Sequence, residues 1–184
     1  MSNSRKKFTT KKMVSIALMV AIICIISPIA IPMVSGVPIT LQTFIIALAG
    51  SFLHSKWGTS SVFLYILLGG IGIPVFSAYG SGFGKIFGIT GGFIWGFLFL
   101  AFFCGIQIKT KKKWFRYFLR FLFGFIGLLL CHIFGILQFS FITENSFISS
   151  AIIVSIPYLV KDIISVFAGI ILGELLHNRI HFEQ

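Results

Sequence analysis

Apolar residues in this chain form long unbroken runs instead of narrow stripes or strictly alternating positions. Stretches without a charged side chain cover residues 13–55, 57–84, 86–108 and 121–143. A helix needs about 20 predominantly apolar residues to cross a bilayer. The pattern therefore predicts six membrane-spanning helices, at about residues 13–33, 39–54, 58–74, 89–108, 117–138 and 157–177.

Turn-forming and polar residues mark the connections between these helices. Residues 35–38 read as a turn, residues 54–56 as a short connection and residues 77–84 as a glycine-rich loop. Another loop begins at Thr143, and residues 147–154 are expected to form a short helix at the membrane surface. The sequence thus predicts an all-α fold, with residues 1–184 in a single six-helix membrane domain.

The distribution of basic residues predicts the orientation of this domain, because cytoplasmic loops carry an excess of Lys and Arg. An even number of spans places both termini on one side. With that side in the cytoplasm, all 15 basic residues except Lys85 and Lys161 lie inside. Residues 1–12 then form a basic cytoplasmic N-terminal segment, and residues 109–116 a basic cytoplasmic loop. The outer face collects the segments 35–38, 77–88 and 143–156.

Composition and charge narrow the possible functions. The chain is 57% hydrophobic and 10% charged, against about 25% charged residues in soluble domains, so no soluble domain of useful size is expected. The net charge of +11 comes largely from clusters beside membrane segments and does not indicate nucleic-acid binding. Cys24, Cys104 and Cys131 lie in apolar runs without a CxxC pair, so neither a disulfide nor a metal site is predicted.

Asp162 is the first candidate for a functional residue, because a long apolar helix pattern follows it directly. A charge at the centre of a membrane helix costs about 2.5–3.5 kcal/mol on insertion scales, which makes such a residue a functional candidate. The alternative is a carboxylate at the membrane surface that only caps a helix. Lys161 and Asp162 point to different helix faces and need not neutralise each other, whereas Lys161 shares a face with Ser165.

Glycines recur every four residues from Gly80 to Gly96. On a helix, this spacing lets neighbouring backbones approach closely, and that is the role expected for Gly92 and Gly96. Residues 78–85 are too rich in glycine for a confident helix start. There, Gly80 and Gly82 allow close backbone approach to a ligand, with free amides that favour an anionic group.

Motifs for catalysis are missing from the sequence. Gly84-Lys85 is not a P-loop, since Tyr79 and Ile86 stand where that motif needs Gly and Ser or Thr. Any ATP-driven work would need another subunit to hydrolyse the ATP. His132 is a lone histidine in an apolar run, where hydrogen bonding to a neighbouring helix is the usual role. No HExxH, GxSxG or aspartyl pair is present, so the chain is not expected to be an enzyme.

Four segments resemble the BioY family in the order and spacing that the family shows. Residues 37–43, VPITLQT, resemble its VPITLQ segment, and residues 65–76, YILLGGIGIPVF, look like its LYLLLGxxGxPVF. Residues 88–93, GITGGF, are similar to its GPTGGY, and residues 157–162, PYLVKD, match its PxxPGD more loosely. The chain departs from the family with Ile89 in place of Pro, and with Ser165 where the family has Lys.

The resemblance implies a biotin-specific substrate-binding subunit of an energy-coupling-factor (ECF) transporter, with six membrane helices. Such a multi-pass subunit lies in the cytoplasmic membrane of a prokaryote and takes biotin from outside. It needs no cofactor, and it works with a transmembrane coupling subunit and two ATPase subunits. Ala17 and Ala21 form a small-xxx-small pair, similar to the family's contact with the coupling subunit.

Several residues are expected to bind the ligand. Asp162 would accept a ureido N–H of biotin, and Gln42 or a loop amide would donate to the carbonyl. Aromatic residues would cover the apolar rings, and Lys85 or Lys161 would meet the carboxylate, with Lys161 replacing the lysine that position 165 lacks. The full predicted set is Gln42, Tyr79, Gly80, Gly82, Lys85, Thr90, Gly91, Phe93, Tyr158, Lys161, Asp162 and Ser165.

Two other functions stay open at this point. The first is a binding subunit for a different small vitamin or precursor, such as lipoate, dethiobiotin or a dicarboxylate, because the glycine loop and position 165 differ from the family pattern. The second is a polytopic membrane enzyme, against which the lack of a nucleophile or metal set argues.

Overall fold

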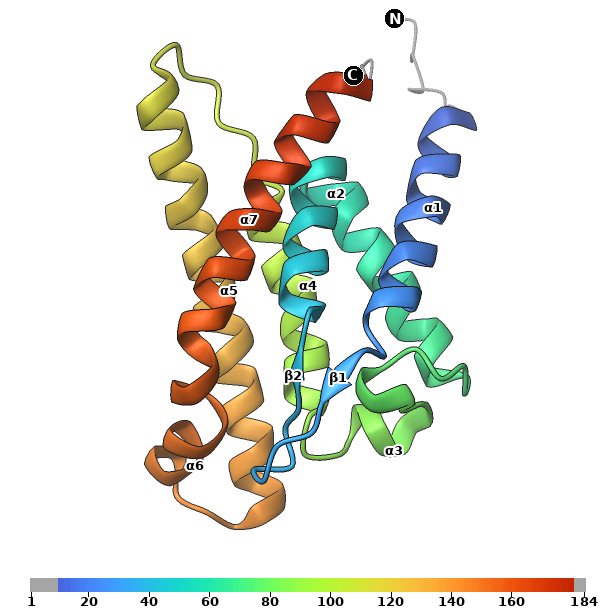
Figure 1. Cartoon of the computed structure of the whole chain (residues 1–184), viewed down its shortest axis with the longest axis vertical. Helices are drawn as coiled ribbons and strands as arrows, with labels where there is room; N and C mark the ends of the chain where they lie inside the picture. Colours follow the sequence, from blue (N-terminus) through green and yellow to red (C-terminus); the bar gives the residue numbers. More distant parts are fainter. Residues whose placement is uncertain (1–9, 181–184) are drawn as a thin grey trace, which may run out of the picture.

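The computed structural model describes residues 10–180, and these are almost entirely helical (Figure 1). The predicted all-α class is therefore confirmed, with one addition, a two-stranded antiparallel ribbon that pairs Ala30 with Thr40. The helices are α1 (Thr10–Ile26), α2 (Gln42–Gly70), α3 (Gly82–Ile86), α4 (Gly91–Cys104), α5 (Lys113–Thr143), α6 (Phe147–Val154) and α7 (Ile156–Ile180). The ribbon is β1 (Ala30–Ile31) with β2 (Ile39–Thr40), and a 3-10 turn, η1, covers Ser77–Tyr79. Most of the predicted basic N-terminal segment, residues 1–12, lies outside the described residues.

Several predicted boundaries shift. The first helix ends at Ile26 and not near residue 33, because Pro28 disfavours a helical conformation at Ser27 and lacks the N–H that a helix needs. The predicted start of the fifth helix near residue 117 is also wrong: α5 begins at Lys113 and takes in part of the expected basic loop. The short helix expected at residues 147–154 is present as α6 with those bounds.

A break inside α2 separates the second and third predicted helices at the expected place. His54 adopts φ 63° and ψ 170°, which no helix tolerates, so α2 consists of two helical halves on either side of it. The break rests on the end of α4, where the Ser55 amide donates to the Gly105 carbonyl at 3.0 Å. A Cβ atom on Gly105 would lie 2.3 Å from the Ser55 nitrogen, so only glycine fits this contact.

Close helix packing builds the core around α4, which contacts both α2 and α5, while α7 packs on α2 and α5 and α1 packs on α2. A Cβ atom on Gly92 would meet the Phe134 carbonyl oxygen at 2.1 Å, and one on Gly96 would meet Cys131 Cα at 2.6 Å. The packing role predicted for these two glycines is thus confirmed. Small residues at such contacts bring the helix backbones together.

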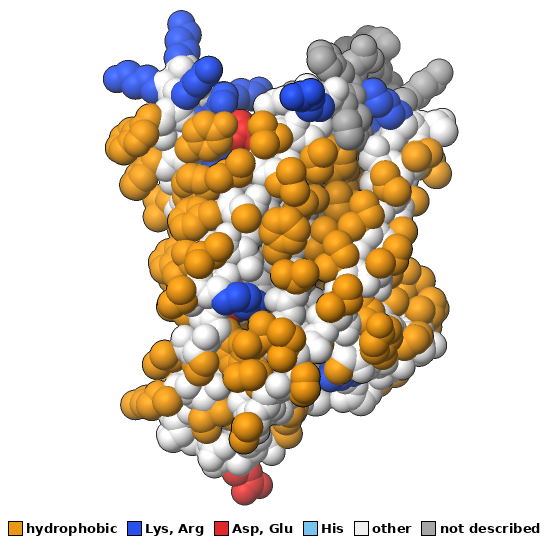
Figure 2. All heavy atoms as spheres, viewed as in Figure 1, with side chains coloured by type: hydrophobic (Ala, Val, Ile, Leu, Met, Phe, Trp, Pro, Cys, Tyr) orange, Lys and Arg blue, Asp and Glu red, His pale blue; other side chains and the backbone are white. Residues whose placement is uncertain are grey.

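The molecule has two distinct ends (Figure 1). The starts of α1 and α5, the end of α7 and the break in α2 lie at one end, called here the terminal end. The β1–β2 connection, α3 and α6 lie at the other, called the loop end. Between them, large apolar side chains such as Leu18, Phe118 and Ile164 remain exposed, and Figure 2 shows them around the sides, with basic side chains gathered at the terminal end. Within residues 10–180, α5 is the one helix whose own length and hydropathy suffice to cross a bilayer.

Candidate functional site

A small cavity lies toward the loop end, between the start of α2, α4, α5, α7 and the segment that carries β2. Six of the predicted ligand-binding residues line it, namely Gln42, Thr90, Phe93, Tyr158, Lys161 and Asp162. The enclosed space is about 50 Å³. A water molecule needs about 10–15 Å³ on this measure, so the cavity as it stands holds a few waters and not a bicyclic ligand.

Asp162 is the centre of the polar wall and is only 6% exposed. Thr43 donates its hydroxyl to Asp162 Oδ1 at 2.5 Å, Lys161 forms an ion pair with the same oxygen, and His132 Nε2 lies 3.4 Å from Oδ2. The sequence interpretation that Lys161 and Asp162 need not neutralise each other is wrong for this state, because the long Lys161 side chain curls back to its neighbour. A buried charge is tolerated only when it is paired and hydrogen-bonded, and both conditions hold here.

Sequence reasoning gave His132 no catalytic role and expected contact with a neighbouring helix, and the structure places it against the Asp162 carboxylate on α7. Its other ring nitrogen, Nδ1, lies 2.8 Å from Ser155 Oγ, and its ring meets Phe93 edge to face at 5.8 Å. These contacts fix the orientation of the imidazole. No spacing rule links His132 to Asp162, so only the packing of α5 on α7 shows that they meet.

Of the neighbours Gln42 and Thr43, the sequence analysis predicted only Gln42 as a ligand-binding residue. Gln42 was predicted, and its amide donates to Tyr65 at 2.9 Å while Thr40 donates to its carbonyl oxygen at 3.2 Å. Both ends of the Gln42 side chain are therefore engaged. Thr43 was missed, although it closes the same VPITLQT segment. Its hydroxyl donates to Asp162 across the molecule.

The segment 35–40 is fastened to α7 over the cavity. Tyr158 donates its hydroxyl to the Val37 carbonyl at 2.5 Å and lies 2.6 Å from Ser35 Oγ. Lys161 donates to the Thr40 carbonyl at 2.9 Å. Three side-chain contacts from two residues of one helix thus join the segment to α7.

Comparison with known proteins identifies the family of this chain. The family model described as the BioY family matches residues 1–182. This chain belongs to the BioY family.

It is 34% identical over 174 residues to the biotin transporter BioY2 of Lactococcus lactis subsp. cremoris (strain MG1363), covering 92% of this chain and 94% of that protein. The probable biotin transporter BioY of Pyrococcus horikoshii is 32% identical over 170 residues, covering 92% and 98%. A crystal structure described as the S-component for biotin from an ECF-type ABC transporter has a TM-score of 0.81 and 28% identity, with both chains covered completely.

The four BioY-like segments have distinct positions around the cavity. Residues 37–43, 88–93 and 157–162 each contribute to its wall. Residues 65–76 lie behind it: Tyr65 receives the Gln42 amide and meets Phe76 edge to face at 5.5 Å. Three of the four segments therefore meet at one cavity, and the fourth lies next to it.

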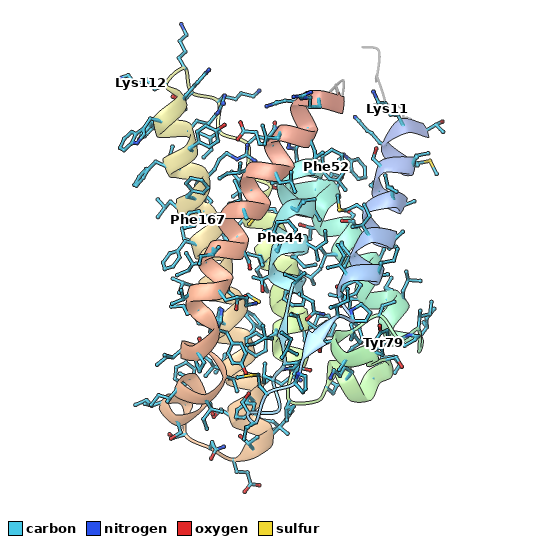
Figure 3. The ribbon with its side chains drawn as sticks, in the orientation of Figure 1. Lys11, Phe44, Phe52, Tyr79, Lys112 and Phe167 are labelled. Atoms are coloured by element: carbon cyan, nitrogen blue, oxygen red, sulfur yellow. The ribbon has the colours of Figure 1, made fainter. Side chains whose placement is uncertain are left out.

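Ser77, the first residue of the glycine-rich loop, lines this cavity, but the predicted ligand-binding residues of the loop do not. Tyr79 is 70% exposed and lies at the outside of the loop end (Figure 3), while Gly80 and Gly82 do not line the wall. Gly82 has φ 76°, a conformation that favours glycine. Lys85 packs its aliphatic stem against Gly80, and burial lowers the pKa of its amine. The ligand roles predicted for these four residues stay predictions.

Gly91 and Ser165 support the site from outside the cavity. A Cβ atom on Gly91 would lie 1.7 Å from the Ile86 carbonyl oxygen, so only glycine fits. Ser165 is buried one helical turn beyond Asp162 and does not line the cavity. Thr90 does line it, and its buried hydroxyl has no hydrogen-bond partner. That hydroxyl is available to a ligand.

Proposed function

We propose that this chain binds biotin at the Asp162 cavity, as the substrate-binding subunit of an ECF-type transporter and not as an enzyme. The names of its relatives and its structural likeness to a biotin S-component support this function. The observation that carries it is the buried Asp162 carboxylate, held by Thr43, Lys161 and His132 beside aromatic walls. Ligand sites are mostly apolar with a few placed polar groups.

The polar groups of the cavity match the ureido ring of biotin, which has two N–H donors and one carbonyl. Asp162 accepts a ureido N–H. Thr90 donates its unpartnered hydroxyl to the carbonyl, because both ends of Gln42 are already engaged. Phe93 and Tyr158 cover the apolar rings. A site built to hydrogen-bond a ligand strongly rejects analogues that leave its buried groups unpaired.

Binding requires the cavity to grow, since about 50 Å³ cannot hold biotin. The segment 35–40 is the part proposed to move, because it lines the cavity and side-chain hydrogen bonds from Tyr158 and Lys161 join it to α7. Both residues also line the cavity. A ligand that draws Lys161 away from Thr40 therefore couples its own binding to the opening of this segment.

The biotin carboxylate meets Lys161 or Lys85, and the two roles can be separated. Biotin amide has the same rings without the carboxylate charge. If Lys161 meets the carboxylate, Lys161→Ala weakens biotin binding and leaves biotin amide binding nearly unchanged. If Lys161 acts only on Asp162, Lys161→Ala weakens the binding of biotin and of biotin amide equally. Lys85→Ala should then weaken the binding of biotin and leave that of biotin amide nearly unchanged.

The chain crosses the cytoplasmic membrane of a prokaryote six times in this proposal, through α1, the two halves of α2, α4, α5 and α7. The exposed apolar sides and the basic terminal end support this placement (Figure 2). Both termini then lie in the cytoplasm and the Asp162 cavity opens outward. Single cysteines placed at residues 82 and 112 and labelled from outside test it: only the first should react.

Its partners are a transmembrane coupling subunit and two ATPase subunits of an ECF module. Ala17 and Ala21 support contact with the coupling subunit, since both are exposed on the outer face of α1. Replacing both by Leu should abolish copurification with that module while leaving biotin binding intact. Unchanged copurification would remove this contact from the proposal.

Biotin binding to the purified full-length protein in nanodiscs tests the function directly, by calorimetry. Saturable, stoichiometric binding in the nanomolar range is expected. A dissociation constant above about 10 μM, a free energy near −7 kcal/mol, would overturn the assignment. Dethiobiotin and lipoate are the competitors to include, because Ser165 replaces a family lysine beside the site. Tighter binding of either would make that compound the ligand.

A further inference from the structure

A second cavity, of about 250 Å³, lies at the terminal end, away from the Asp162 cavity. Four remote parts of the chain build it: the break in α2, the segment after α4, the first turns of α5 and the last turns of α7. Basic side chains gather at this end (Figure 2). The proposed transport function does not use any of these residues.

The charges of this cavity do not balance. Arg116 Nη2 lies 3.1 Å from Glu174 Oε1, and Arg120 Nη1 lies 3.1 Å from Glu174 Oε2. Lys109 lines the same cavity. One carboxylate thus faces three permanent cations among the described lining residues, which leaves a net charge of two positive units. Such a cavity favours an anion and rejects a cation.

The arginines also have unused donors. Arg120 is 9% exposed and lines the cavity, and its Nη2 donates to Ser51 at 2.7 Å. Its Nε, like that of Arg116, is buried without a hydrogen-bond partner. A buried donor without an acceptor costs free energy, and native proteins rarely leave one so. An anion with several oxygens would supply the missing acceptors.

Two histidines and a glutamine complete the wall. His54 and His177 lie with their Nε2 atoms 3.2 Å apart, and Gln107 Nε2 lies 2.8 Å from His54 Nδ1. Imidazole and amide groups add hydrogen-bonding groups to the wall. These groups make the wall polar beside the cations, and a polar, positively charged wall suits a small, strongly hydrogen-bonding anion.

We propose that this terminal-end cavity binds a phosphate group through Arg116, Arg120 and Lys109. Guanidinium groups match the geometry of phosphate oxygens and bind them with two parallel hydrogen bonds. Two sources carry this chemistry, a free phosphate and the headgroup of an anionic phospholipid. In either case the bound anion joins α5 and α7 at the end where the predicted cytoplasmic loops lie.

The free-phosphate arm of the test measures thermal unfolding of the full-length protein in detergent. Inorganic phosphate is titrated against potassium chloride of equal ionic strength. A saturable rise in the unfolding midpoint with phosphate only is expected. Arg116→Gln and Lys109→Gln should each weaken the apparent affinity at least about tenfold, the size of one charge-assisted hydrogen bond.

Lys112→Gln is the matched control, since it removes one positive charge from the same loop outside the cavity. Circular dichroism verifies that each variant keeps its helix content, independently of any ligand. The lipid arm counts phospholipids retained after purification from nanodiscs that mix phosphatidylglycerol with phosphatidylcholine, by native mass spectrometry. Retained phosphatidylglycerol that Arg116→Gln loses and Lys112→Gln keeps identifies the headgroup as the source.

Two results would overturn the proposal. One is equal stabilisation by phosphate and chloride with no selective lipid retention, which would make the cluster a structural ion network. The other is equal behaviour of Arg116→Gln and Lys112→Gln in both arms, which would reduce the effect to overall charge.

Discussion

Asp162 and Glu174 are both buried carboxylates on α7, at 6% and 7% exposure, but their surroundings differ. Asp162 meets a hydroxyl, an imidazole and one flexible ammonium group in a cavity with aromatic walls. Glu174 lies between two guanidinium groups in a cavity where the cations outnumber it. The first environment leaves the carboxylate able to exchange partners. The second environment fixes the Glu174 carboxylate between Arg116 and Arg120, whose Nε donors have no hydrogen-bond partner.

This difference separates a residue that recognises a ligand from one that organises its neighbours. The Lys161 ammonium has an alternative acceptor in the Thr40 carbonyl, and its side chain is partly exposed. Arg120 cannot leave Glu174, because its guanidinium is buried and donates to Ser51 as well. We therefore expect Asp162 variants to change ligand affinity and Glu174 variants to change stability.

The largest effect is expected from Glu174→Gln, which removes the carboxylate that two arginines share. Breaking a buried ion pair from one side costs about 3–5 kcal/mol, because a buried charge is left uncompensated. The free energy of unfolding should fall by that order, as measured by denaturant titration in detergent. Biotin affinity should stay within about twofold, measured on the folded fraction. A large loss of biotin affinity would show that the two ends are coupled.

Asp162→Ala should weaken biotin binding by at least tenfold. Removing one partner of a buried charged hydrogen bond costs about 2–5 kcal/mol. Calorimetry with Asp162→Asn as the companion variant separates charge from shape, since Asn keeps a carbonyl acceptor. We expect Asn to retain part of the affinity. If Asp162→Ala binds as tightly as the unaltered protein, Asp162 is not in the site.

His132→Ala should weaken biotin binding by a smaller amount, because His132 acts through Asp162. Leaving a buried polar partner unsatisfied costs about 1–3 kcal/mol, and both Ser155 and Asp162 lose a contact here. Asn at position 132 can restore a donor and serves as the rescue variant. In Asp162→Ala, the His132 substitution should have little further effect, and full additivity of the two losses would contradict a positioning role.

Tyr158→Phe tests the fastening of segment 35–40. It removes the hydroxyl that contacts Val37 and Ser35 while keeping the ring, and one hydrogen bond contributes about 1 kcal/mol. Biotin association should become up to about fivefold faster in stopped-flow measurements, because the segment must open before biotin enters the cavity. Tyr79→Phe is the control, because Tyr79 is exposed outside the cavity. Equal effects of the two substitutions would contradict this role of Tyr158.

The smallest expected effect concerns Lys85. Burial lowers the pKa of its amine, so this group loses its proton at a lower pH than an ordinary lysine does. If Lys85 meets the biotin carboxylate, affinity should fall as pH rises through that lowered pKa. Lys85→Arg should remove the decline, because arginine stays charged. A pH profile shared by both proteins would exclude Lys85 from this role.

Local patterns along the chain were sufficient for much of the fold. The break at residues 54–56, the short helix at 147–154 and the packing glycines Gly92 and Gly96 were all predicted correctly. Each depends on neighbouring residues: a polar connection between apolar runs, a short apolar stretch after a loop, and a four-residue spacing. Family resemblance added the three segments that surround the cavity.

The pairings at both cavities could not be predicted in this way. Thr43 meets Asp162, and Ser51 accepts from Arg120, across 119 and 69 positions of the chain. No local sequence pattern placed His132 or Glu174 in a cavity. Tyr79 was predicted to bind the ligand but lies outside the Asp162 cavity. The sequence by itself determined the helical class, the candidate acid and the family, because these depend on local hydropathy and motifs. Only the tertiary structure decided which polar groups share a cavity, because helix packing brings together side chains that no sequence period relates.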